Sequence, residues 1–82
     1  MNMREHIKAR LNEVFCDVFE DESIIISDET TANDIEEWDS LSHISLVIAV
    51  QAAFAVKMSV AEIAGFKNVG SMIDLLLLKV SK

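Results

Sequence analysis

The chain has no proline and only two glycines, Gly65 and Gly70, which limits the turns it can form. Tight β-hairpins commonly use Asn-Gly or Asp-Gly pairs, and the sequence contains neither. Their absence argues against a β-sandwich or barrel and favours helices. At 82 residues the chain is long enough for one domain and too short for two.

The charge distribution is uneven. The net charge is −7, which repels nucleic acid and anionic lipid, so we expect neither as a partner. Ten acidic residues and no basic ones lie in residues 15–39, whereas residues 40–56 carry no formal charge. The acidic stretch has the composition of a solvated linker. It lacks the alternating acids and the glycine of an EF-hand loop, so we predict no metal site.

The single cysteine, Cys16, cannot form an internal disulfide, and the first residues do not resemble a cleaved leader. These features predict a cytoplasmic protein. The most apolar window, residues 44–56, is thirteen residues long and therefore too short to span a bilayer. We predict no membrane span.

Apolar spacing predicts a first helix over residues 3–19. Its stripe comprises Ile7, Leu11, Val14, Phe15 and Val18. Cys16 lies about 155° from the centre of this stripe at 100° per residue, which predicts an exposed side chain. Residues 20–39 have no sustained period and are predicted to form a long loop. Its expected tethers to the core are Ile24, Ile25, Ile26, Ile35 and Trp38.

Capping signals predict three further helices. The second begins at Asp39-Ser40, where either side chain can cap, and runs to about Phe54. Ser59 and Glu62 form a capping-box pattern that opens a short third helix. The fourth helix is expected to be capped by Asn68, with a shared apolar face of Val69, Ile73, Leu76, Leu77 and Val80.

The second helix is apolar on two opposite sides. One side comprises Leu46, Val47, Val50, Ala53 and Phe54, and the other comprises Leu41, Ile44, Ile48 and Ala52. A fully central helix would bury both sides. In so small a bundle, however, one side is expected to reach the surface as a patch for a partner or ligand.

No catalytic site is predicted. Ser40 lacks a Gly-x-Ser-x-Gly elbow, and neither His43 nor His6 has a neighbour in sequence that would orient it as a base. His43 is therefore interpreted as a surface or capping residue. Cys16 has no adjacent group to activate its thiol. Two histidines and one scattered cysteine do not make a metal site.

The tripeptide Asp39-Ser40-Leu41 resembles the attachment motif of the acyl carrier protein family. The resemblance extends in order and spacing over nearly the whole chain, including residues 68–76. It implies an all-α, four-helix acyl-carrier-like bundle, with a long acidic loop between helices one and two and a short third helix. It also implies that residues 1–82 form a single acyl carrier domain, expected to be a monomer.

The resemblance also implies a function. Ser40 would carry 4′-phosphopantetheine through a phosphodiester, and the thiol of this arm would hold acyl groups as thioesters. Asp39 and Leu41 would complete the motif read by a phosphopantetheinyl transferase. Leu41, Ile44 and Ile48 match positions that contact acyl-loading and acyl-processing enzymes in this family. A carrier performs no reaction itself, in agreement with the lack of catalytic residues.

Two departures from typical fatty-acid-synthesis carriers refine the prediction. The acids usual along helix two are missing, and so is the glycine shortly before the motif. The run from Trp38 to Leu41 looks more like freestanding carriers that serve dedicated biosynthetic pathways. The alternative is a small non-catalytic helical protein-interaction module that uses the apolar face of helix two.

Overall fold

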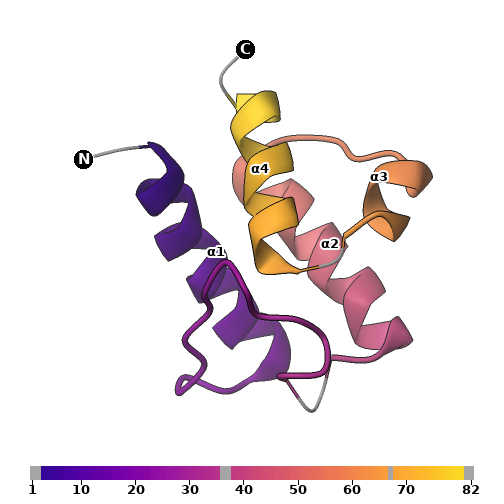
Figure 1. Ribbon diagram of the computed structural model, residues 1–82. Coiled ribbons are helices and arrows are strands. Elements are labelled where there is room, and N and C mark those ends of the chain that lie inside the picture. Colours follow the sequence, from indigo (N-terminus) through magenta and orange to yellow (C-terminus); the bar gives the residue numbers. More distant parts are fainter. Residues whose placement is uncertain (1–2, 36–37, 67, 81–82) are drawn as a thin grey trace.

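The computed structural model describes residues 3–35, 38–66 and 68–80, with the side chain of Ser40 excepted. This part of the chain contains four helices and no strand (Figure 1). The helices are α1 (Met3–Phe19), α2 (Ser40–Phe54), α3 (Val60–Ala64) and α4 (Val69–Val80). The predicted all-α fold is confirmed.

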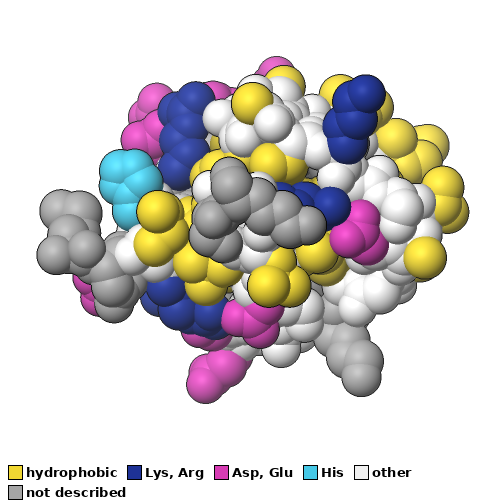
Figure 2. Space-filling model, turned by 90° about the horizontal axis from the view of Figure 1, so that it is seen from above, with side chains coloured by type: hydrophobic (Ala, Val, Ile, Leu, Met, Phe, Trp, Pro, Cys, Tyr) yellow, Lys and Arg dark blue, Asp and Glu magenta, His cyan; other side chains and the backbone are white. Residues whose placement is uncertain are grey.

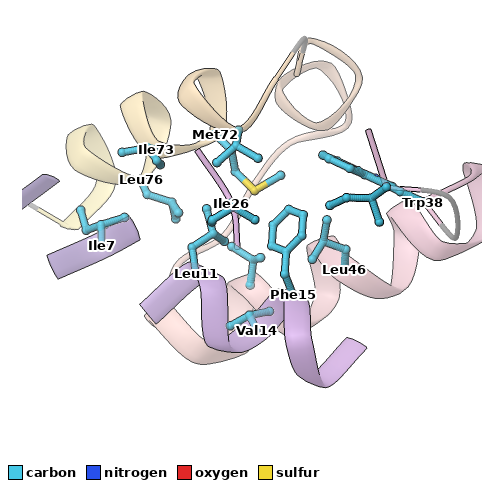
Figure 3. Packing of buried hydrophobic residues seen from close by; sticks show 13 residues of the cluster. Ile7, Leu11, Val14, Phe15, Ile26, Trp38, Leu46, Met72, Ile73 and Leu76 are labelled. Atoms are coloured by element: carbon cyan, nitrogen blue, oxygen red, sulfur yellow. The ribbon is translucent and has the colours of Figure 1, made fainter. Parts of the chain in front are cut away.

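The core lies between α1, α2, α4 and the loop that connects α1 to α2. Figure 3 shows side chains from all four segments meeting there, with Phe15 of α1 beside Leu46 of α2. The ring of Trp38, from the end of the loop, meets Phe15 edge to face at a centroid distance of 5.2 Å. None of the helices in the described ranges is both long and apolar enough to cross a bilayer.

The loop of residues 20–39 follows the predicted tethers with one exception. Ile26, Ile35 and Trp38 are buried, and Ile24 is half-buried against the core. Ile25 is 88% exposed, so its prediction as a tether was wrong. Ile25 lies between the half-buried Ile24 and the buried Ile26, and its own side chain points into solvent.

Backbone hydrogen bonds join this loop to the start of α4. Val69 N donates to Thr30 O at 2.8 Å, and Gly70 N donates to Asp28 O at the same distance. The first N–H groups of a helix have no partner within that helix, so the loop carbonyls satisfy two of them. Gly70 is required here because a Cβ would lie 2.9 Å from Asp28 O. The loop and α4 thus pack backbone to backbone.

Side chains of α1 also bind this loop. The Arg4 guanidinium donates to the Asp28 carboxylate at 2.6 Å, and Lys8 lies 3.3 Å from it. The bond from Arg4 is the main reason that the pKa of Asp28 is lowered. Asn12 receives the Ile26 N–H at 2.7 Å. Basic and acidic side chains also lie next to one another on the face shown in Figure 2.

Cys16 departs from its prediction. The side chain is half-buried, and Sγ lies 3.6 Å from Ile24 O and 3.6 Å from Asn12 Nδ2. Helical periodicity correctly turns Cys16 away from the main core stripe. The loop folds over that side of α1, however, and covers the cysteine. The expected exposure was wrong because the position of the loop cannot be deduced from the periodicity of α1.

The caps of α3 and α4 are as predicted. In α3, Ser59 and Glu62 form both bonds of the capping box, at 2.8 and 3.2 Å. In α4, Ser71 N donates to the Asn68 side chain at 2.9 Å. Val69, Ile73 and Leu76 are fully buried, together with Met72, which the sequence pattern did not include; Leu77 and Val80 are half-buried.

Candidate functional site

The candidate site lies at the start of α2, where Asp39 caps the helix. Its backbone is extended, with φ −110° and ψ −169°, and its carboxylate accepts the Ser42 N–H at 2.8 Å. This backbone hydrogen bond is the main reason that the pKa of Asp39 is lowered. Ser40 follows as the first helical residue, and its side chain lies outside the described part of the structure. The predicted helix start is confirmed, and the cap is Asp39.

The two apolar sides of α2 have different environments. Leu46, Val47 and Val50 are at most 2% exposed and pack in the interior. On the opposite side, Leu41 is 78% exposed, Ile44 57% and Ile48 62%. These last three residues form what we call the outer face of α2. A fully central helix is therefore excluded, and the predicted exposed apolar side is confirmed.

The outer face is apolar and uncharged. The neighbouring Ser45 and Ala52 are also exposed, and residues 40–56 contain no Asp, Glu, Lys or Arg. Long-range electrostatic attraction to this part of α2 is therefore weak, and the ten acids of the preceding segment must supply most of it. A partner of this face would bind it mainly by burying apolar surface.

His43 joins three segments next to the candidate site. The indole N–H of Trp38 donates to His43 Nδ1 at 3.0 Å, and the two rings stack with an interplanar angle of 21°. His43 Nε2 lies 3.3 Å from Ile63 O of α3, and Phe66 meets the imidazole edge to face. His43 was interpreted from the sequence as a surface or capping residue. No sequence pattern indicated these contacts, because the partners of His43 come from a loop and from α3.

A cavity of about 430 Å³ opens beside these rings. Trp38 and Asp39 line it from the loop, His43 from α2, and Ile63 and Phe66 from α3 and the residues that follow it. Asp39 and His43 are also the residues immediately before and three positions after Ser40. The cavity therefore adjoins the start of α2. No signal in the sequence pointed to it, because its walls are distant along the chain.

The described residues also bear on metal binding. In residues 3–35, 38–66 and 68–80, no group of three or more His, Cys, Asp or Glu side chains is close enough together to hold a metal ion. Four of the described acids between α1 and α2 are instead engaged in capping and loop contacts, namely Asp21, Asp28, Asp34 and Asp39. Asp21, for example, accepts hydrogen bonds from Ser23 N and Oγ, which lower its pKa.

Comparison with known proteins defines the class. Residues 9–76 match the family model described as a phosphopantetheine attachment site. A solution NMR structure of a holo acyl carrier protein from Geobacter metallireducens superposes with a TM-score of 0.84. It is 40% identical in sequence, and the match covers 92% of this chain and 85% of that one. No curated protein matches at a significant level.

The protein is thus a small helical carrier rather than an enzyme. It belongs to the phosphopantetheine-attachment family, as an acyl carrier protein whose covalent cofactor is 4′-phosphopantetheine. The cofactor supplies a terminal thiol, and the protein supplies the surface that presents it to enzymes. Membership of this family favours the carrier over the interaction module considered from the sequence.

Proposed function

We propose that Ser40 is the attachment residue for 4′-phosphopantetheine. The observation that carries the proposal is the position of the Asp39-Ser40-Leu41 motif in the first turn of α2, within the matched residues 9–76. The local structure suits this role in two respects. Asp39 supplies the helix cap, so the cap does not require the Ser40 hydroxyl. Leu41, the next residue, is 78% exposed, which places this turn at the surface.

The attachment reaction can be written with the groups named. A phosphopantetheinyl transferase would join the Ser40 hydroxyl oxygen to the phosphorus of the pantetheine phosphate of coenzyme A. The bond to the nucleotide phosphate breaks, 3′,5′-ADP leaves, and the hydroxyl proton is lost. In this proposal Asp39 fixes the first turn of α2 by accepting the Ser42 N–H, and Leu41 presents an apolar side chain to the transferase.

Intact mass spectrometry tests the attachment. Treatment with a promiscuous transferase and coenzyme A should add one phosphopantetheinyl group to the wild type and to Ser42→Ala, and none to Ser40→Ala. Ser40→Ala should unfold at nearly the wild-type temperature, because Asp39 and not Ser40 caps α2. Modification of a folded Ser40→Ala, or none of the wild type with several active transferases, would refute the assignment.

We further propose that the outer face of α2, formed by Leu41, Ile44 and Ile48, contacts the enzymes that load and process the acyl group. Its exposure and its position next to Ser40 support this role. Ile48→Glu should weaken transfer from the cognate loading enzyme at least severalfold. Lys57→Glu, which also introduces an acid at an exposed position but beyond α2, serves as the control. Equal rates for the two variants would argue against docking on this face.

The absence of charge on α2 supports a dedicated biosynthetic pathway rather than housekeeping fatty acid synthesis. Enzymes with a basic docking patch would find no acids on α2 to set the binding register. Ser45→Glu combined with Ala52→Glu adds two acids at exposed positions. This variant should be a better substrate for a housekeeping malonyl transferase, and the gain should shrink as salt is added. Equal turnover of the wild type and a typical fatty-acid carrier would contradict the proposal.

We also expect the carrier to act as a cytoplasmic monomer comprising residues 1–82 as one domain. The apolar outer face is small, and transient enzyme contacts of this kind need not be covered in the free protein. A sedimentation experiment on the apo and holo forms measures the oligomeric state. A stable dimer at micromolar concentration would contradict the monomer and would indicate that a second copy covers the outer face.

A further inference from the structure

Among the described residues that line it, the cavity beside the start of α2 offers hydrogen-bond acceptors and no free side-chain donor. The single N–H of Trp38 already donates to His43 Nδ1. Nδ1 therefore carries no proton, and the imidazole N–H is on Nε2, where it faces Ile63 O at 3.3 Å. The Asp39 carboxylate accepts one bond at Oδ1 and retains further acceptor capacity. A ligand group that donates hydrogen bonds therefore matches the described lining of this cavity.

The electrostatics of the cavity favour a cation. None of the lining residues that the structure describes is Lys or Arg, and Asp39 is an acid whose pKa is lowered further by the hydrogen bond from Ser42 N. Trp38 and Phe66 add aromatic surface, and the faces of such rings attract ammonium groups. A ligand carboxylate would meet the like charge of Asp39, and no described lining residue is a Lys or Arg that could pair with it.

The size and place of the cavity suit a group carried on the arm. Its volume of about 430 Å³ lies within the range of small-molecule sites. Asp39 directly precedes Ser40 in the chain, so the mouth of the cavity is next to the proposed attachment point. A flexible arm attached there can fold back and place its terminal group against Asp39 and Phe66.

We propose that this cavity binds the protonated amine of an aminoacyl group carried as a thioester, with Asp39 as counter-ion and Phe66 as an aromatic wall. This inference rests on the proposed attachment at Ser40. It names the substrate class as amine-bearing acyl groups. Acyl groups that end in a carboxylate are repelled by Asp39, and short neutral acyl groups gain no ion pair.

Three loaded forms of the protein test the inference. A promiscuous transferase can attach the whole acyl-bearing arm from β-alanyl, butyryl or malonyl coenzyme A. β-Alanyl and butyryl have the same number of heavy atoms and differ in a terminal ammonium against a methyl group. The Trp38 indole N–H is a specific NMR probe, because the chain has one tryptophan. Only the β-alanyl form should shift this signal and the Phe66 amide relative to the unloaded holo protein.

Variants identify the residues responsible. Phe66→Leu and Asp39→Asn should both abolish the β-alanyl shift, the second while keeping a side chain that can cap α2. Ser45→Ala, exposed on α2 away from the cavity, should preserve it. The β-alanyl thioester should also hydrolyse about twofold to fivefold faster on Phe66→Leu than on the wild type, the effect of losing one cation–π contact. The butyryl thioester should hydrolyse equally on both.

The outcomes separate this inference from the attachment proposal. If intact mass detects no loading of the wild type, the attachment at Ser40 fails. If all three acyl groups load but give the same Trp38 signal as the unloaded holo protein, the attachment stands and the aminoacyl cavity is refuted. A larger shift in the butyryl or malonyl form than in the β-alanyl form would refute it as well.

Discussion

The loop between α1 and α2 and the short helix α3 are held in the molecule in opposite ways. The described part of the loop has no regular secondary structure, yet Ile26, Thr30, Ile35 and Trp38 are buried. Helix α3 is regular and has a complete capping box, yet none of its five residues is buried. Regular hydrogen bonding and attachment to the core are therefore separate properties in this protein.

The difference follows from where each segment finds its bonding partners. Carbonyl oxygens of the loop accept hydrogen bonds from the first N–H groups of α4. The Asp28 carboxylate of the loop pairs with Arg4 of α1. Helix α3 satisfies its own first turn through its capping box, and contacts its surroundings through Ile63 O to His43 and Glu62 to Lys79 at 3.2 Å. The loop is thus part of the core, whereas α3 forms an exposed wall of the cavity beside α2.

The largest effect expected within the loop comes from a pair of adjacent isoleucines. Ile26→Ala should lower the free energy of unfolding by about 2–5 kcal/mol, because Ile26 is 5% exposed and its removal leaves a cavity. Ile25→Ala should change it by no more than about 0.5 kcal/mol, since Ile25 is 88% exposed. Chemical denaturation measures both. Similar losses for the two variants would show that the loop is not anchored in the manner described.

The two glycines provide an intermediate test. Gly70→Ala places a Cβ 2.9 Å from Asp28 O, a backbone atom that moves only if the loop moves. Crowding of this kind costs about 1–3 kcal/mol and alanine gains about 1 kcal/mol in helix propensity, so a net loss of about 1 kcal/mol is expected. Gly65→Ala, at the exposed end of α3, should stay within about 0.5 kcal/mol of the wild type. A higher melting temperature for Gly70→Ala than for the wild type would contradict the close contact between α4 and the loop.

The smallest expected effect is the dependence of the melting temperature on pH. The pKa of Asp28 is lowered in the folded protein, chiefly by the hydrogen bond from Arg4, so its ionised form stabilises the fold. That contribution is present above the unfolded pKa of about 3.9 and is lost as the pH falls through the lower folded value. Asp28→Asn should therefore melt below the wild type at pH 7, with the difference shrinking at pH 3. A gap independent of pH would exclude the ion pair as its cause.

Local patterns in the sequence predicted much of the fold and the start of the site. The caps at Asp39, Ser59 and Asn68, and the two apolar sides of α2, depend on residues within one or two turns of each other. Such short-range rules work wherever tertiary contacts do not oppose them. They also predicted that the tripeptide at residues 39–41 lies at the start of a helix.

Features that depend on long-range packing were not predictable in this way. Cys16 is covered because the loop returns over α1, and Arg4 pairs with Asp28 across 24 positions in the chain. His43 accepts from Trp38 and faces Ile63, and no periodicity within α2 encodes these contacts. The cavity was missed for the same reason, because its walls come together only when α3 packs beside α2.

The central claim of this account is that α2 has one side in the core and one side free for partners. The free energies of unfolding of Val47→Glu and Ile48→Glu, adjacent residues that are 2% and 62% exposed, test it most directly. Val47→Glu buries an unpaired charge and should cost at least about 3 kcal/mol or prevent folding, whereas Ile48→Glu should remain within about 0.5 kcal/mol of the wild type. Comparable destabilisation by both substitutions would contradict the claim, because the outer face would then be part of the core.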